Sequence, residues 1–322
     1  MLRDLVRGED PALVATEVAL LAVRPHILVL TEIDYDHAGA ALAALADRLR
    51  AGGLDYPHRF LRRPNTGRPT GRDIDGDGRA HGPRDAQGWG RFSGEGGSAI
   101  LSVHPVETSD ARDLSGFLWR DLPGTRIAPK DPAYEVQRLS SDVHWVVPIR
   151  LPSSPRPLSL MVFHATPPVF DGPDDRNGRR NADEIRLWQV LLNGTSGLPR
   201  ITPPFVIAGD ANLDPEAGDG RRGAIRDLLS DPRLQDPMPR TASVDWSRLG
   251  LGEMRVSYLL PSRDLVLRDA GTYRAAPEAG EHRLVWIDVA LPPDPDISDS
   301  GEAPADDTDV LDSGSNAPAR RR

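Results

Sequence analysis

The sequence contains no cysteine, and this absence narrows the chemistry available to the chain. Disulfide bonds, thiolate zinc sites and cysteine nucleophiles are all excluded, so any metal ion must bind to oxygen or imidazole groups. An excess of positive charge is also lacking, because the formal net charge is -9 at pH 7. That charge works against tight, sequence-independent binding of long nucleic acids, which depends on many Lys and Arg contacts to phosphates.

Long hydrophobic runs are absent as well. No stretch of about 18 apolar residues occurs, so we expect no membrane span. The first ten residues carry charges where a secretory signal needs an apolar run. The chain as given therefore predicts no export by itself. Secretion becomes an option if upstream residues are missing, and a cytoplasmic location is the alternative.

The chain does have enough apolar material for a core, since 39% of its 322 residues are hydrophobic. We expect one large globular domain over residues 1–291. A Gly-, Arg- and Asp-rich loop insertion interrupts it at residues 62–97. Residues 292–322 contain almost no large apolar side chains to offset ordering entropy, so we predict a disordered acidic tail there.

The hydrophobic pattern predicts a mixed α/β domain. Helical spacing marks residues 11–23, behind an N-cap at Asp10, and also 38–50, 181–192 and 223–229. Short apolar runs predict strands at 27–30, 98–102, 143–149, 158–163, 205–208, 256–260 and 284–289. Many short strands mixed with a few helices, without strict alternation, favour two packed sheets with helices outside, in the class α/β or α+β.

The strongest local motif runs from Phe205 to Asn212, where a buried strand delivers a glycine, then Asp210, then Asn212 at its end. The two polar side chains would point the same way across the strand end. Such a pair suits phosphoryl chemistry, because the carboxylate can orient water or hold a metal while the carboxamide donates to a phosphoryl oxygen. The alternative is an ordinary strand followed by an Asx turn.

Three further polar residues stand at strand ends. Glu32 follows the strand at 27–30, and a lone carboxylate there is a suitable ligand for Mg²⁺. His164 ends one strand and His282 precedes another. Each of the three alone is more often structural or solvated than catalytic, so their weight comes from the combination.

Taken in chain order, Glu32, His164, Asp210 with Asn212, and His282 resemble the pattern of the endonuclease/exonuclease/phosphatase superfamily, the relatives of DNase I and inositol polyphosphate phosphatases. Six short segments carry the resemblance: 30–32, 97–102, 163–164, 209–212, 255–262 and 281–283. It implies a DNase I-like four-layered α/β sandwich, with two packed, mostly antiparallel sheets flanked by helices and the site where the sheets open.

The resemblance also implies a role for each residue. Glu32 would bind Mg²⁺ or Mn²⁺, Asp210 would orient the nucleophilic water, and Asn212 would donate to the scissile phosphate. His282 corresponds to the catalytic histidine and His164 to a phosphate-contacting one. A general acid or base in such a site contributes about 10²- to 10⁴-fold to the rate.

Three departures from the family pattern bear on the rate. The family opens with a strand ending in a metal-binding Asn, and no such strand precedes the first helix here. Its absence should leave a sheet edge unpaired. Ser257 stands where the family has an Asp that orients the catalytic histidine, and Ser brings no charge to stabilise an imidazolium. Glu281 replaces the Asp beside the final histidine.

The loop insertion contains a calcium-like segment. Asp73, Asp75 and Asp77 stand at alternate positions, with Gly76 and Gly78 for tight turning, as at the start of an EF-hand loop. The rest of that motif fails, because Arg84 stands at the twelfth position instead of a bidentate Glu. A bound Ca²⁺ and an acidic turn that holds no ion are both open.

Arginines gather in the same loop and in a second cluster that contains Arg179, Arg180 and Asn181. Guanidinium groups suit phosphate oxygens, so both segments could form a positive funnel for a small or terminal phosphate. The alternative is that these arginines pair with neighbouring carboxylates on a solvated surface.

The sequence therefore predicts a metal-dependent hydrolase of a phosphomonoester or phosphodiester, acting on a small molecule or a nucleic-acid end. A nuclease acting on DNA or RNA is the main rival. A catalytically silent binding module of the same fold is the alternative from another class, favoured by the missing Asn strand and Ser257. No obligate protein partner is evident.

Overall fold

The computed structural model describes residues 1–152, 154–195 and 197–291, which belong to one compact unit. The predicted tail at 292–322 lies outside the described residues. The helices are α1 (Leu2–Arg7), α2 (Pro11–Val23), α3 (Ala40–Ala51), α4 (Arg176–Asn193) and α5 (Gly223–Leu229). The strands are β1 (Ile27–Ile33), β2 (His58–Phe60), β3 (Gly97–Ser102), β4 (Arg112–Asp113), β5 (His144–Ile149), β6 (Leu158–His164), β7 (Phe205–Asp210), β8 (Val244–Trp246), β9 (Gly252–Met254), β10 (Ser257–Pro261), β11 (Val266–Tyr273) and β12 (Leu284–Ala290).

Helix α2 shows how closely local signals set an element. Its N-cap Asp10 accepts hydrogen bonds from the backbone N–H groups of Ala12 and Leu13, at 2.9 and 3.1 Å. Pro11 occupies the first turn, where its missing N–H costs nothing. The helix ends at Val23, before Arg24 in the left-handed conformation. The observed range is the predicted one.

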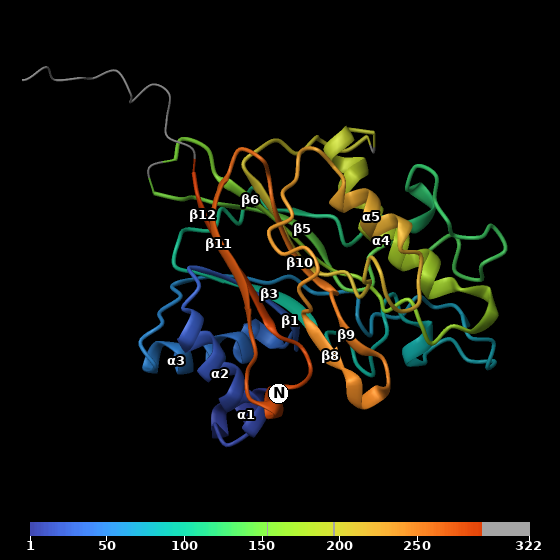
Figure 1. Ribbon diagram of the computed structural model, residues 1–322. Coiled ribbons are helices and arrows are strands. Elements are labelled where there is room, and N and C mark those ends of the chain that lie inside the picture. The colour runs from blue at the N-terminus through green and yellow to red at the C-terminus, as the bar shows by residue number, and fades with distance from the viewer. Residues whose placement is uncertain (153, 196, 292–322) are drawn as a thin grey trace, which may run out of the picture. The chain divides into compact units, whose positions relative to one another are not determined.

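Two larger sheets organise the described residues. One has the strand order β1-β3-β2 and the other β10-β7-β6-β5-β4, while β11 with β12 and β8 with β9 form two-stranded pairs (Figure 1). Every pairing of named strands is antiparallel except that of β6 with β7, which is parallel. In the described part of the chain, β1 pairs with β3 alone, so its other edge has no strand partner.

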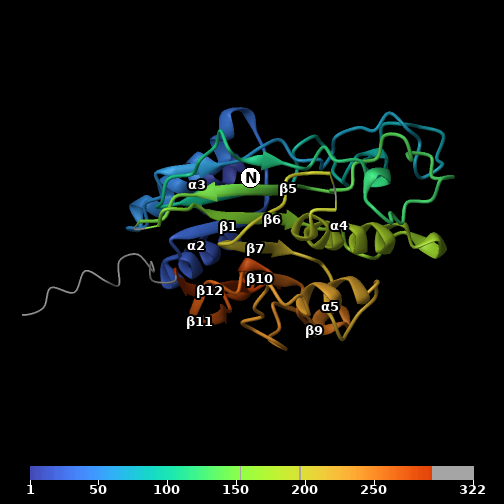
Figure 2. The same cartoon turned by 90° about the horizontal axis from the view of Figure 1, so that it is seen from above.

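Alternating side chains divide the core into separate clusters. Leu28 of β1 packs with α1, α2 and α3, whereas its neighbours Ile27 and Val29 face the cluster that the two larger sheets share. In β7, Val206 belongs to that shared cluster and Ile207 packs with α4 and α5. This is the two-residue period of a strand buried on both faces. In Figure 2, α2 and α3 lie to the left and α4 and α5 to the right.

The structure differs from the sequence-based prediction in several elements. The segment Arg176–Arg180, which stands before the helix predicted at 181–192, is the first part of helix α4. The start of this helix was missed because its first residues are mostly charged or polar, and the apolar residues at helical spacing come only in its later turns. Strand β11 was not predicted because its sequence, Val266 to Tyr273, is not an apolar run, and most of its residues are partly exposed. Four further short strands, β2, β4, β8 and β9, were also missed.

A buried histidine gives the fold a pH dependence. His144 is fully buried between the Ser140 hydroxyl and the Glu184 carbonyl, each 3.0 Å from a ring nitrogen. Burial lowers the pKa of His144 to about 4. The unfolded chain therefore takes up a proton between about pH 6.5 and 4 that the folded chain does not bind.

We accordingly expect the free energy of unfolding to fall as the pH decreases through this window, with His144 contributing up to about 3 kcal/mol. Burial raises the pKa of Asp142 to about 6, which opposes part of the loss. Urea unfolding at pH 7 and pH 5 should show a smaller decrease for His144→Gln than for the unchanged protein. An equal decrease would remove His144 as the cause.

Candidate active site

The register of three neighbouring strands brings polar residues into one row. His164, at the end of β6, pairs with Asp210, at the end of β7. On the other side of β7, Asp210 pairs with Ser257, the first residue of β10. Asn212 follows with a positive φ of 48°, a conformation that Asn tolerates better than most residues. The sheet therefore places three predicted site residues side by side.

Close packing of β6 against β7 requires the glycine before Asp210. A Cβ at Gly209 would lie 1.9 Å from the backbone oxygen of Phe163. We expect Gly209→Ala to lower the free energy of unfolding by about 1–3 kcal/mol or more. Gly223 has no atom within 4 Å of its Cβ position, so Gly223→Ala should be neutral or stabilise by up to about 1 kcal/mol. Denaturant unfolding of both variants tests the contrast, and equal effects would contradict it.

Asp210 lies at the centre of the row. One carboxylate oxygen, Oδ1, accepts a hydrogen bond from the backbone N–H of Asn212 at 2.7 Å. The other, Oδ2, lies 3.5 Å from Nδ1 of His282 and 3.4 Å from the Ser257 hydroxyl. Asp210 is buried, whereas His282 is half-exposed and meets the ring of Trp246 edge-on. A fixed carboxylate thus faces an accessible imidazole.

His164 connects the row to a buried carboxylate. Its Nε2 lies 3.2 Å from the amide nitrogen of Asn212, and its Nδ1 lies 3.9 Å from Oδ2 of Asp142. Asp142 is fully buried and accepts a 2.5 Å hydrogen bond from the Ser98 hydroxyl. The sequence did not single out Asp142, because it stands before a strand without any recognisable motif.

Glu32 lies at the end of β1, where the pairing register with β3 shifts between Leu30 and Ile33. Its backbone has a positive φ of 59° and its side chain is exposed. Its negative charge is one of the factors that raise the pKa of Asp142, after burial and the charge of Glu184. The carboxylate predicted to bind metal therefore lies within electrostatic range of the His164 pair.

The three predicted phosphate-binding residues all lie on helix α4, but they differ in burial and in hydrogen bonding. Arg180 is buried, and its guanidinium donates to four backbone carbonyls, those of Gln87, Arg138, Leu139 and Ser140. Asn181 is also buried and its amide donates to the carbonyls of Thr166 and Ala211. Both side chains therefore use their N–H groups in hydrogen bonds to backbone carbonyls outside helix α4.

Arg179 is partly exposed and donates to the carbonyls of Asp175 and Arg126, each at 3.3 Å. A direct phosphate contact by Arg180 or Asn181 would require these buried bonds to break, so neither side chain is placed as predicted. A phosphate contact by Arg179 stays a prediction. The Asn181 bond to Ala211 instead fixes the residue between Asp210 and Asn212.

The predicted calcium loop also changes in composition. Asp73 and Asp75 have carboxylate oxygens within 4.8 Å of each other, and the third member of the group is Asp85. The predicted third ligand, Asp77, is outside the group and accepts a hydrogen bond from the backbone N–H of Arg79. Asp85 already accepts from the N–H groups of Ile74 and Gly82. Calcium binding here stays a prediction.

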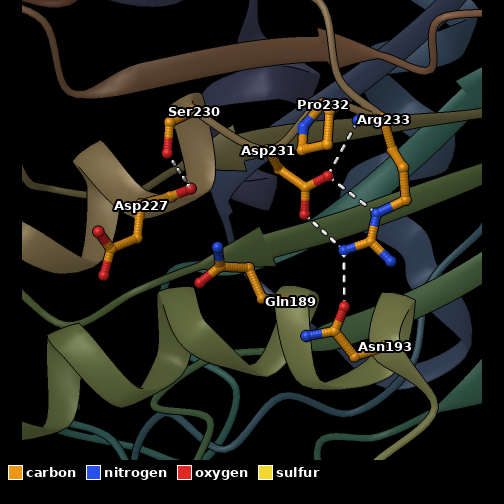
Figure 3. Close-up of a pocket in the computed structure, with 7 residues that line it drawn as sticks. All are labelled: Gln189, Asn193, Asp227, Ser230, Asp231, Pro232 and Arg233. Atoms are coloured by element: carbon orange, nitrogen blue, oxygen red, sulfur yellow. Dashed lines mark hydrogen bonds and ion pairs between the residues drawn. The ribbon is translucent and has the colours of Figure 1, made fainter.

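A surface hollow of about 600 Å³ lies elsewhere, between the end of α4 and the residues after α5. Its one arginine, Arg233, is paired with Asp231 and also bonds Asn193 (Figure 3). None of the predicted site residues lines it. Its only cationic side chain is already paired with Asp231, so the row at the end of β7 is the stronger candidate site.

Comparison with known families decides the relationship. A family model described as the endonuclease/exonuclease/phosphatase family matches residues 2–299. This chain belongs to that family. Members of the family are generally hydrolases of phosphate esters and include nucleases, phosphatases and phosphodiesterases, typically dependent on divalent metals. The mixed α/β content, with several sheets and few helices, is consistent with their DNase I-like fold.

Solved structures support the fold at low identity. The endonuclease/exonuclease/phosphatase from Beutenbergia cavernae DSM 12333 is 17% identical with a TM-score of 0.57, covering 86% of this chain and 65% of that protein. A family protein from Leptotrichia buccalis C-1013-b is 14% identical with a TM-score of 0.52, covering 87% and 93%. No curated protein matches the sequence. Within the described ranges, none of the helices combines the length and hydrophobicity that a bilayer crossing requires.

Proposed function

We propose that this protein hydrolyses a phosphomonoester or phosphodiester by attack of an activated water molecule, in the presence of a divalent cation. The observation that carries the proposal is the contact between the buried Asp210 carboxylate and the accessible His282 imidazole, 3.5 Å apart at the end of β7. A carboxylate that orients water and a histidine that moves a proton are the two groups that such a reaction needs.

The side chains of the site fit a hard cation. Glu32 and Asp210 supply carboxylate oxygens, which Mg²⁺ and Mn²⁺ prefer, and the chain offers no sulfur ligand from cysteine. One oxygen of the nearby Asp142, Oδ1, is buried without a hydrogen-bond partner, so the region has acceptor capacity to spare. We propose Glu32 as the principal ligand. When bound, the cation would neutralise charge that develops on the phosphate.

Asp210 and His282 have separate roles in the proposed reaction. Asp210 is held by the Asn212 N–H and the Ser257 hydroxyl, so its carboxylate is fixed in direction and can orient a water molecule. His282 is half-exposed and can reach a substrate oxygen as a proton donor or acceptor. Its Nδ1 faces Asp210, which leaves Nε2 for the substrate.

We also propose that the separate core clusters correspond to the four-layered sandwich of the family.

A second candidate function is a silent binding module. Ser257 occupies the position of the carboxylate that usually orients the catalytic histidine, and its hydroxyl contacts Asp210 at 3.4 Å without adding charge. A site with one carboxylate where relatives have two could bind a phosphate ester without turning it over.

Hydrolysis of bis(4-nitrophenyl) phosphate and 4-nitrophenyl phosphate by the purified chain, with Mg²⁺, Mn²⁺, Ca²⁺ or EDTA, tests the proposal. We expect turnover of at least one ester with Mg²⁺ or Mn²⁺ and its loss in EDTA. Restored turnover on adding back the ion would exclude damage by the chelator. Plasmid and single-stranded DNA in the same assay separate the nuclease alternative. A folded protein with no metal-dependent turnover would favour the silent module.

A further inference from the structure

The amide of Asn212 has one orientation that satisfies its neighbours. Its Nδ2 lies 2.9 Å from the carbonyl oxygen of Ala165 and 3.2 Å from Nε2 of His164. A carbonyl oxygen accepts and cannot donate, so the nitrogen of the amide, and not its oxygen, must face Ala165. The second N–H of the same nitrogen then points at His164.

This orientation shows which tautomer of His164 is present. Because the Asn212 amide donates to Nε2, that nitrogen must be unprotonated, and the neutral ring carries its proton on Nδ1. The Nδ1–H side of the ring faces Oδ2 of Asp142 at 3.9 Å. That distance exceeds a hydrogen bond, so Asp142 acts on the ring through electrostatic attraction.

Asp142 is held where this attraction is strong. It is fully buried, and the Ser98 hydroxyl donates to the same oxygen that faces His164. A second buried carboxylate, that of Glu184, is occupied by Ser141 and by the backbone N–H of Thr166. Attraction between a buried charge and a ring dipole is weakly screened. Asp142 is therefore the carboxylate positioned to select the Nδ1–H form.

We propose that Asp142, His164 and Asn212 form a positioning relay, in which the buried carboxylate selects the Nδ1–H tautomer of His164. The unprotonated Nε2 of the ring and the Ala165 carbonyl then hold the Asn212 amide together. Asp142 and His164 are positioning residues. Since both N–H groups of Asn212 are used within the protein, the group left for a ligand is its oxygen Oδ1, which no protein group bonds in the described residues. Asn212 thus offers an acceptor instead of the donor expected from the sequence.

An amide oxygen at this place accepts from a water molecule or binds a cation, whereas an amide NH₂ group binds a phosphate oxygen. This last step rests on the proposed function, because it concerns what the site holds. The tautomer of His164 does not, and it can be measured without any substrate.

The decisive measurement is the tautomer of His164 in the full chain with ¹⁵N-labelled histidine, read from long-range ¹H–¹⁵N correlations at pH 8. His164→Gln assigns the signal among the eight histidines. We expect the Nδ1–H form in the unchanged protein and in Asp142→Asn, which keeps an acceptor oxygen. Asp142→Leu, which keeps the size and removes both oxygens, should shift the ring to the intrinsically favoured Nε2–H form.

The matched control is Asp231→Ala, which removes another buried carboxylate, one paired with Arg233 and outside the site. It should leave the His164 signal unchanged. An imidazolium or an Nε2–H ring in the unchanged protein would overturn the relay, as would an Nδ1–H ring in Asp142→Leu. If Asp142→Leu does not fold, the state of the ring in the unchanged protein and in Ser98→Ala, expected to remain Nδ1–H, still decides the question.

Measuring kcat of the same variants gives a second test, which is independent of the tautomer measurement. With bis(4-nitrophenyl) phosphate and Mn²⁺ as the probe, Asp142→Leu should lower kcat about tenfold to a hundredfold through misplacement of Asn212, and Asp142→Asn should recover most of it. A tautomer shift in a protein with no turnover would support the relay and reject the proposed function. Turnover that is indifferent to the shift would reject the role of the relay in catalysis.

Discussion

Replacement of Asp210 by asparagine is expected to lower kcat about 10²- to 10⁴-fold for any phosphate ester that the protein turns over. Asparagine keeps the shape of the side chain and an oxygen that can accept from the backbone N–H of Asn212, so the strand end should stay folded. What is lost is the negative charge that faces His282 and the basic oxygen that orients water. KM should change much less than kcat, because this loss acts in the transition state.

The matched control for this variant is Asp227→Asn, on the exposed side of α5. It removes one negative charge from the same domain and should leave kcat unchanged. Steady-state kinetics and a thermal unfolding curve for both variants separate catalysis from stability. An Asp210→Asn protein that is folded and keeps more than half of its kcat would reject Asp210 as the residue that orients water.

His282→Ala is expected to reduce kcat by a similar factor, about 10²- to 10⁴-fold. Because His282 is half-exposed and contacts Trp246 by an edge-on ring packing, its removal should cost little stability. The control is His26→Ala, an exposed histidine before the start of β1, at the opposite end of that strand from Glu32.

The contact between Asp210 and His282 also predicts that the effects of the two substitutions on kcat are not additive. If Asp210 and His282 act as one unit, the double variant should be little slower than the slower single variant. A double-mutant cycle measures this directly. Independent factors that multiply in the double variant would mean that the 3.5 Å contact is incidental to catalysis.

The strand-end residues could be predicted because each one follows or precedes an apolar run that defines its strand. Asp210 and His164 gain their proximity from parallel pairing of β6 with β7, which places them opposite each other. No local pattern in the sequence indicates that register. The expectation that these residues lie together came from the resemblance to a known family.

The residues beneath the site could not be predicted, because their roles depend on burial and not on local pattern. Asp142 and Arg180 are charged residues in segments without motifs, and each is fully buried by elements distant in the chain. Arg180 was expected at the surface since arginine rarely enters a core unless its donors are satisfied. Four backbone carbonyls satisfy them here, and only the three-dimensional arrangement reveals those carbonyls.

The row formed by His164, Asp210 and Ser257 has a kinetic consequence. Its members come from separate strands, and His282 reaches the row from a segment further along the chain. Such contacts close long loops, whose entropy must be lost before the contacts form. Helical content can therefore return early when the unfolded chain is diluted from denaturant, whereas phosphate-ester turnover has to wait for the β7 to β10 pairing and the docking of His282. Activity is then a late reporter of folding in this protein.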